Sequence, residues 1–183
     1  KEEVLPGELP NTKKIRITVE EMPTGEISAG AGIGTNGGSF AFSIKENNWL
    51  GKGMQVSANA DVSQDSLRGS ISFTDTNYNF TGKSLTYNLE NIKNDKPDSG
   101  YENSLLGAGI GVSYEKFKDI YFAPGVKFSI DDLSTDETAS ELLKKQSGTT
   151  TDLMFDYSLF TDKRDRTFMP TSGNLTSFYQ ELP

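Results

Sequence analysis

The sequence predicts an all-β protein, an antiparallel meander of about nine strands of the kind that builds a transmembrane β-barrel. First, apolar and polar side chains alternate in successive runs from Ile15 to the C-terminus, which is the period of a β-strand. Second, the runs are roughly ten residues long, the length a strand needs to cross a bilayer at a tilt. Third, the polar alternates are Gly, Ser, Thr, Asn, Asp, Lys and Gln throughout, as in a water-filled barrel interior.

The first two runs, 26–34 and 39–45, predict a β-hairpin joined by Thr35-Asn36-Gly37-Gly38, because Asn-Gly favours the positive φ of tight turns. Residues 32–37 also match the G-x-G-x-x-G pattern of dinucleotide-binding loops. That loop must be followed by a helix whose N-terminus holds a pyrophosphate. Here the next residues alternate as a strand does, so we expect no cofactor at these glycines.

Seven further strands are predicted where apolar residues fall at every second position. These runs cover 54–62, 67–73, 85–89, 106–114, 120–130, 153–159 and a last segment that starts near Asn174.

The connections alternate between two ends of the meander. Connections after the first, third, fifth and seventh strands lie at one end, and the last two of these four are long and acidic. In the last one, residues 138–146 predict a short helix capped by Thr138 and Glu141. The connections at the other end are shorter or rich in aromatics. Longer loops at one end are typical of outer-membrane barrels. An interfacial girdle is predicted from the aromatics at strand ends, Trp49, Tyr78, Phe80, Phe117, Tyr121 and Phe168.

Composition excludes several classes of function. The net charge of −8 makes nucleic acid a poor partner. The chain has no cysteine and no histidine, which removes zinc–thiolate sites, thiol nucleophiles and the commonest general base. No recognisable acid–base pair remains, so we expect no catalytic residue, no metal, no cofactor and no enzymatic activity. The N-terminal segment does not resemble a signal peptide.

Two alternatives stay open on pattern alone. A soluble antiparallel sandwich, for example a carbohydrate-binding one, also has alternating strands. A passive pore or a two-partner secretion transporter would share the barrel pattern. The membrane interpretation requires that the apolar side chains do not converge on a second sheet.

Several segments resemble the BamA family. "TGEISAGAGIGTNGGSFAFSIKENNWLGKGMQVSANADVS" is similar to the family's opening hairpin and first inner turn, and "SISFTDTNYNFTGKSL" to the next turn. In that turn Thr76 stands where proline is usual, and an Asn is inserted between Tyr78 and Phe80. "DYSLFTDKRDRTFMPTSGNL" is similar to the inner turn between the eighth and ninth strands, and "KIRITVEEMPTG" to the end of the last POTRA domain.

The resemblance implies how the chain is organised. Residues 1–22 would be the end of the last POTRA domain and its linker, and 23–183 the N-terminal portion of a sixteen-stranded barrel. Because the family's Val-Arg-Gly-Phe motif is not in these residues, we expect a fragment whose two open sheet edges are covered by another copy or chain.

The resemblance also implies a function, the folding and insertion of β-barrel proteins into the bacterial outer membrane. Implied partners are outer-membrane lipid, unfolded barrel substrates and accessory lipoproteins. Glycine weakens strand pairing, so the first strand is a candidate openable seam to which a substrate strand pairs: Ile27, Ser28, Ala29, Gly30, Ala31, Gly32, Ile33 and Gly34. Equally, the glycines relieve crowding, since Gly107, Gly109 and Gly111 repeat the pattern in mid-sheet.

A second candidate site is the inner turn that contains Asp162, Arg164, Asp165, Pro170 and Gly173. It would contact POTRA domains or lipoproteins, or be a solvated turn held by Arg–Asp pairs. We expect Asp61, Arg68 and Glu90 to face the barrel interior.

Overall fold

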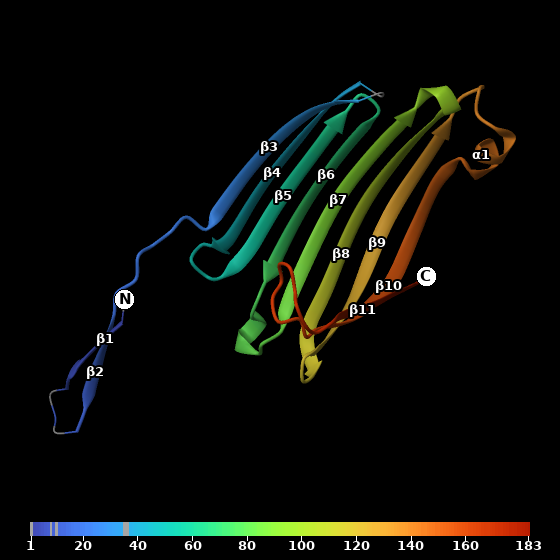
Figure 1. Ribbon diagram of the computed structural model, residues 1–183. Helices are drawn as coiled ribbons and strands as arrows, with labels where there is room; N and C mark the ends of the chain where they lie inside the picture. Colours follow the sequence, from blue (N-terminus) through green and yellow to red (C-terminus); the bar gives the residue numbers. More distant parts are fainter. Residues whose placement is uncertain (1, 8, 10, 35–36) are drawn as a thin grey trace.

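A computed structural model describes residues 2–7, 9, 11–34 and 37–183 of the chain. Its main body is one antiparallel sheet of nine strands in meander order, in which each strand pairs with its sequence neighbours (Figure 1). This confirms the predicted fold class. The strands are β3 (Gly25–Gly34), β4 (Gly37–Trp49), β5 (Met54–Ser63), β6 (Ser66–Asp75), β7 (Ser84–Lys96), β8 (Tyr101–Phe117), β9 (Ile120–Thr135), β10 (Gly148–Asp162) and β11 (Leu175–Leu182).

The strand register separates the two faces of the sheet. Directly paired residues of antiparallel strands lie on the same face. One row across β3 to β10 is almost wholly apolar, and we call its side the apolar face: Ile27, Ile44, Ala58, Ile71, Leu89, Ala108, Phe128 and Leu153. The adjacent row defines the polar face: Ser28, Ser43, Asn59, Ser70, Glu90, Gly107, Ser129 and Asp152.

Large side chains of the apolar face are not packed into a core. Ile71, Leu89 and Leu153 keep 55%, 57% and 53% of their surface exposed. A sandwich would bury these residues against a second sheet, and the described residues contain no second sheet over this face. The sandwich alternative is therefore wrong.

The central strands are longer than predicted. The runs predicted at 85–89 and 106–114 leave a long connection between them, but β7 continues to Lys96 and β8 begins at Tyr101, with only the 3-10 turn η2 (Pro97–Ser99) between them. The polar residues of this stretch form ladder pairs such as Asn94–Asn103. The apolar period stops here, and an alternation rule misses strands that are polar on their outward side. Lys93 and Glu102, paired at 3.0 Å, occupy the side of the apolar face in this extension.

The predicted helix is present but begins later than expected. Helix α1 spans Glu141–Gln146, and its N-cap is Ser140, whose hydroxyl accepts a hydrogen bond from the amide of Leu143 at 3.3 Å. Thr138 is not the cap, because its hydroxyl and amide both donate to the Asp136 carboxylate. Among the described residues, no helix is long and apolar enough to cross a membrane.

The N-terminal residues form a separate hairpin of β1 (Glu2–Pro6) and β2 (Lys13–Ile17). In Figure 1 it lies away from the nine-stranded sheet, joined to β3 by an extended segment. Strand β2 ends at Ile17, so Val19 lies outside it. The assignment of residues 1–22 to a POTRA domain stays a prediction.

Candidate functional site

The predicted seam residues all lie on β3, at one edge of the sheet. The strand pairs with β4 on one side, and the other side has no partner strand among the described residues. Ile27 pairs with Ile44 on the apolar face, and Ser28 pairs with Ser43 on the polar face. The hairpin is therefore confirmed, although two of its predicted turn residues, Thr35 and Asn36, lie outside the described part of the chain.

The two glycine runs differ in what surrounds them. A Cβ placed on Gly107 would lie 2.9 Å from both Cγ and Oε1 of Glu90, so this glycine makes room for a carboxylate side chain that lies across the sheet. A Cβ at Gly30 or Gly34 would meet nothing within 4 Å. Crowding therefore explains Gly107 but explains neither Gly30 nor Gly34.

The start of β3 is anchored to β4 through Thr24. Its hydroxyl donates to Glu46 at 2.5 Å, and its carbonyl accepts from the amide and side chain of Asn47 at 3.2 and 2.9 Å. Both groups lie next to a shift in the register of β4 and β5 between Glu46 and Trp49. Sequence reasoning missed the anchor, because nothing in the local pattern marks Thr24 as a partner of a residue twenty-two positions later.

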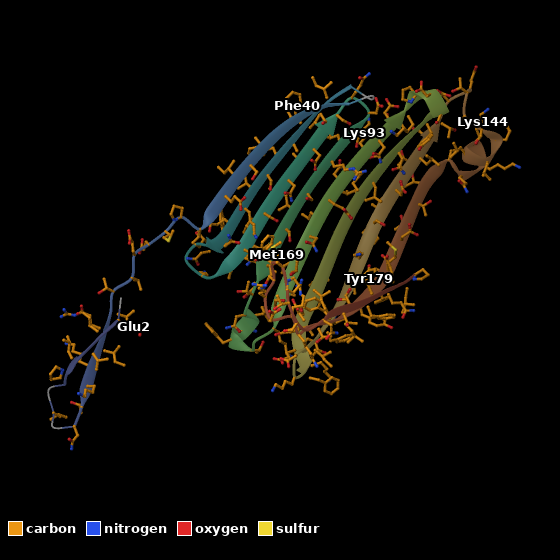
Figure 2. The ribbon with its side chains drawn as sticks, viewed as in Figure 1. Glu2, Phe40, Lys93, Lys144, Met169 and Tyr179 are labelled. Atoms are coloured by element: carbon orange, nitrogen blue, oxygen red, sulfur yellow. The ribbon has the colours of Figure 1, made fainter. Side chains whose placement is uncertain are left out.

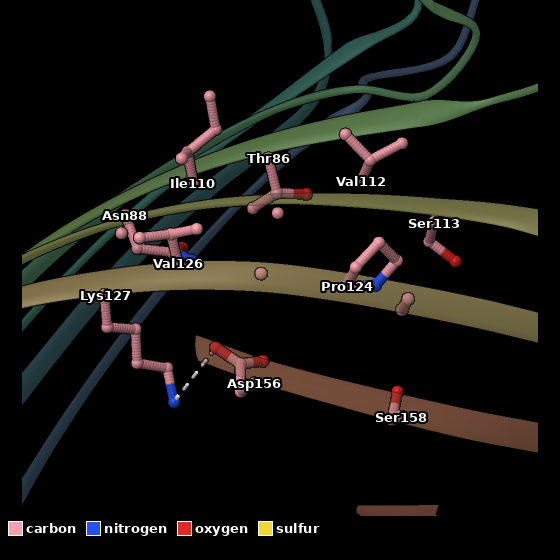
Figure 3. A pocket seen from close by; sticks show the side chains of 14 residues that line it. Thr86, Asn88, Ile110, Val112, Ser113, Pro124, Val126, Lys127, Asp156 and Ser158 are labelled. Carbon is pink, nitrogen blue, oxygen red and sulfur yellow. Dashed lines mark ion pairs between the residues drawn. The ribbon is translucent and has the colours of Figure 1, made fainter. Parts of the chain in front are cut away.

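The polar face has a shallow hollow of about 190 Å³ over β7 to β10. Its lining includes Gly109, Gly111 and Gly125, and Lys127 and Asp156 point toward each other at one side (Figure 3). The Lys127 ammonium lies 3.9 Å from Asp156 and 3.8 Å from Glu181, and it donates to the Tyr179 hydroxyl at 3.1 Å. This cluster ties β9, β10 and β11 together.

The predicted lumen charges lie together on the polar face. Asp61 pairs directly with Arg68, and Glu90 pairs with Ser70. No group of three or more His, Cys, Asp or Glu in the described part of the chain could hold a metal ion. The absence of a metal, a cofactor and a catalytic residue stays a prediction.

The turn between β10 and β11, residues 163–174, is held by its own polar groups. Arg164 makes a two-pronged contact with Asp162, with nitrogen–oxygen distances of 2.9 and 2.7 Å. Asp165 accepts from the Thr171 hydroxyl at 2.6 Å and from the amides of Thr171 and Ser172 at 2.9 and 3.1 Å. These hydrogen bonds, above all that of Thr171, hold the pKa of Asp165 below its usual value.

Two further predicted residues shape the same turn. Gly173 has φ of 88°, and a Cβ there would collide with the Lys163 carbonyl. Pro170 immediately precedes the two residues that bind Asp165. The structure thus brings the predicted inner-turn residues together as a self-contained turn, and their contact with another protein stays a prediction.

Bulky residues with left-handed backbone are a feature that sequence reasoning missed. Leu50, Phe80 and Met169 have φ of 56°, 57° and 49°, a conformation that costs an L-residue roughly 1–2 kcal/mol. All three lie in the connections from β4 to β5, β6 to β7 and β10 to β11. No sequence signal marks them, because turns of this kind ordinarily take glycine or asparagine.

An open antiparallel meander with one exposed apolar face and one polar face defines a segment of a β-barrel wall. Comparison with known proteins agrees. Residues 48–182 match the Omp85 superfamily domain, and the chain therefore belongs to the Omp85 superfamily.

Individual relatives confirm the predicted resemblance to the BamA family. The chain is 29% identical over 168 residues to the outer membrane protein assembly factor BamA of Neorickettsia risticii, and the match covers 87% of the chain and 22% of that protein. The crystal structure of BamA from Haemophilus ducreyi lacking POTRA domains 1–3 matches all of the chain and 38% of that structure, with a TM-score of 0.72 and 20% identity. The chain thus spans about a fifth of the curated relative's length.

Proposed function

We propose that this protein is part of an outer-membrane β-barrel assembly factor that folds and inserts barrel proteins into the bacterial outer membrane. Support comes from membership of the Omp85 superfamily and from the similarity to BamA over most of the chain. The exposed apolar face suits acyl chains. We therefore propose that the sheet lies in the outer membrane and that residues 1–22 lie in the periplasm as the end of a POTRA domain.

The observation that carries the mechanism is the edge of β3. Backbone groups at an open sheet edge are costly in lipid, where water does not satisfy them, so this edge favours pairing with an incoming strand. Gly30 and Gly34 add no side-chain contacts to β3. A strand of this composition pairs weakly and exchanges partners readily.

The proposed partners follow from the surfaces. Lipid contacts the apolar face, an unfolded barrel substrate pairs with β3, and accessory lipoproteins contact the inner rim around residues 163–174. No step needs a nucleotide or cofactor, because backbone pairing and apolar burial supply the driving force. We propose no enzymatic activity.

Crosslinking tests the edge directly, because the chain has no native cysteine. Ser28→Cys places a thiol on β3, and Ser72→Cys places one on the same face of the interior strand β6. In proteoliposomes that receive an unfolded barrel substrate with a single cysteine in its terminal strand, we expect a disulfide with the Ser28→Cys variant and none with the Ser72→Cys variant. Equal crosslinking at both positions, or no gain of insertion over empty liposomes, would contradict the proposal.

A two-partner secretion transporter or passive pore remains the alternative. It predicts passage of an extended substrate or ions without strand pairing at β3. Conductance or export in the same proteoliposomes, with no substrate inserted, would favour it.

A further inference from the structure

The inner turns share a backbone feature with one another. We define them as the connections from β4 to β5 (50–53), β6 to β7 (76–83), β8 to β9 (118–119) and β10 to β11 (163–174). Each contains a residue other than glycine with positive φ: Leu50, Asn79, Phe80, Asp119 and Met169. In the described part of the chain, only Asn11 shares this conformation elsewhere.

The bulky residues at these positions are also exposed. Leu50, Phe80 and Met169 keep 73%, 95% and 69% of their surface accessible, and Phe168 beside Met169 keeps 81%. Figure 2 shows Met169 on the last inner turn, far from Lys144 on α1 at the opposite end of the sheet. A strained backbone that displays an exposed apolar side chain gains nothing within the chain, so its benefit lies in a contact outside it.

Charge distinguishes the two ends of the sheet. The inner turns contain six basic residues against two acidic ones: Lys52, Lys83, Lys118, Lys163, Arg164 and Arg166 against Asp119 and Asp165. The described connections at the other end contain five acidic residues against two basic ones: Asp65, Asp98, Asp136, Glu137 and Glu141 against Lys144 and Lys145. The chain is acidic overall, so the basic end is a local concentration.

Most of this positive charge is not neutralised by neighbours. Among the described residues, Lys52, Lys118 and Lys163 have no carboxylate within 4.0 Å, whereas Arg164 is paired with Asp162. Lys83 lies 5.4 Å from the centre of the Tyr114 ring, which leaves its charge intact. Ammonium groups beside exposed Leu and Phe side chains match the interface of a bilayer, where phosphate lies next to acyl chains.

We propose that the inner turns form a collar that binds anionic phospholipid, with the apolar tips Leu50, Phe80 and Met169 inserted among the upper acyl chains and the lysines on the headgroup phosphates. The three tips share the left-handed backbone, and each lies in a connection that follows a strand end. The inference rests on the proposed function only in placing the sheet in a membrane.

Trp49 is a built-in reporter for this test, because it is the chain's single tryptophan and adjoins Leu50. The chain is reconstituted in nanodiscs of phosphatidylcholine and phosphatidylglycerol, with the brominated acyl chains on one lipid or the other. We expect brominated phosphatidylglycerol to quench Trp49 more strongly. Lys52→Gln should lower that preference about five-fold, the value of one basic residue near an anionic surface, and the outer-end control Lys145→Gln should leave it unchanged.

The tips are tested with glycine, which keeps the left-handed backbone and removes only the side chain. Leu50→Gly should lower quenching by both lipids, while Leu142→Ala on α1, similarly exposed, should not. The second turn is tested in the same way with Trp49→Phe and Phe80→Trp as reporter and Lys83→Gln as the charge variant.

Equal quenching of Trp49 by the two lipids, or a preference that survives Lys52→Gln, would overturn the collar. Unchanged quenching in Leu50→Gly would overturn the collar as well, and would assign the apolar tips to a protein partner instead. Since no substrate protein is present, failure here leaves the assembly proposal standing, and failure of insertion leaves the collar standing.

Discussion

Stiffening the β3 edge is the sharpest perturbation of the proposed seam. Gly30→Val combined with Gly34→Val adds side chains where a Cβ meets nothing within 4 Å. Each replacement removes a glycine penalty of roughly 0.5–1 kcal/mol in a strand. The two sites are four residues apart on one strand and share no neighbour, so their effects should add.

The expected gain for β3 pairing is therefore about 1–2 kcal/mol, which lowers the frayed population of the strand roughly 5- to 30-fold. Hydrogen exchange of the β3 amides in proteoliposomes measures this change, and the rate of substrate insertion should fall by a similar factor. Gly111→Val is the matched control. It is also a polar-face glycine, its Cβ would lie an ordinary 3.6 Å from the Pro124 carbonyl, and it lies in mid-sheet. If exchange slows at β3 while insertion keeps its rate, edge opening is not part of the mechanism.

Three other substitutions test the geometry elsewhere. The pKa of Asp165 in the folded protein is lowered. The stabilisation that its carboxylate gives the turn is therefore fully present above the ordinary pKa of about 4, and it is lost as pH falls through the lower folded pKa. Thr171→Val should move the loss to higher pH, read by amide exchange at 171 and 172. Lys127→Met leaves Asp156 and Glu181 without their shared cation, and since Lys127 is nearly half exposed we expect at most about 1 kcal/mol, a fall of roughly 2–4 °C in Tm. Gly100→Ala, at φ of 68° and against Asp136 and Thr138, should speed exchange across residues 136–147, and unchanged exchange would contradict the crowding.

Alternation predicted the number, order and pairing of the strands because one physical rule governs all of them. Lipid on one side and water on the other impose a period of two, and each one-residue shift in register would invert both faces. The rule predicted the strands correctly wherever one face is apolar, for example along the row across the sheet that contains Ile71, Leu89 and Phe128. It failed at the tips of β7 and β8, where Lys93 and Glu102 pair with each other and the period disappears although the ladder continues.

The candidate site could be predicted only where its residues lie close together in the sequence. The composition of residues 27–34 predicts a weakly pairing strand, which stays a prediction, and the Asp165 turn lies within one short segment. The contact of Thr24 with Glu46 and the backbone of Leu50 and Phe80 depend on where the strands end in space. Likewise, only the structure separates Gly107, which makes room for Glu90, from Gly30, which faces empty space.

The unequal lengths of the strands have a consequence for what can pair with each of them. Strand β8 has 17 residues and β3 has 10, a difference of about 24 Å at ~3.4 Å per residue. Ten residues is also what a tilted strand needs to span a bilayer, about 9–11. In the proposed mechanism, β3 therefore offers an incoming strand one membrane crossing and no more, so we expect that strand to complete its ladder before its outer loops are ordered.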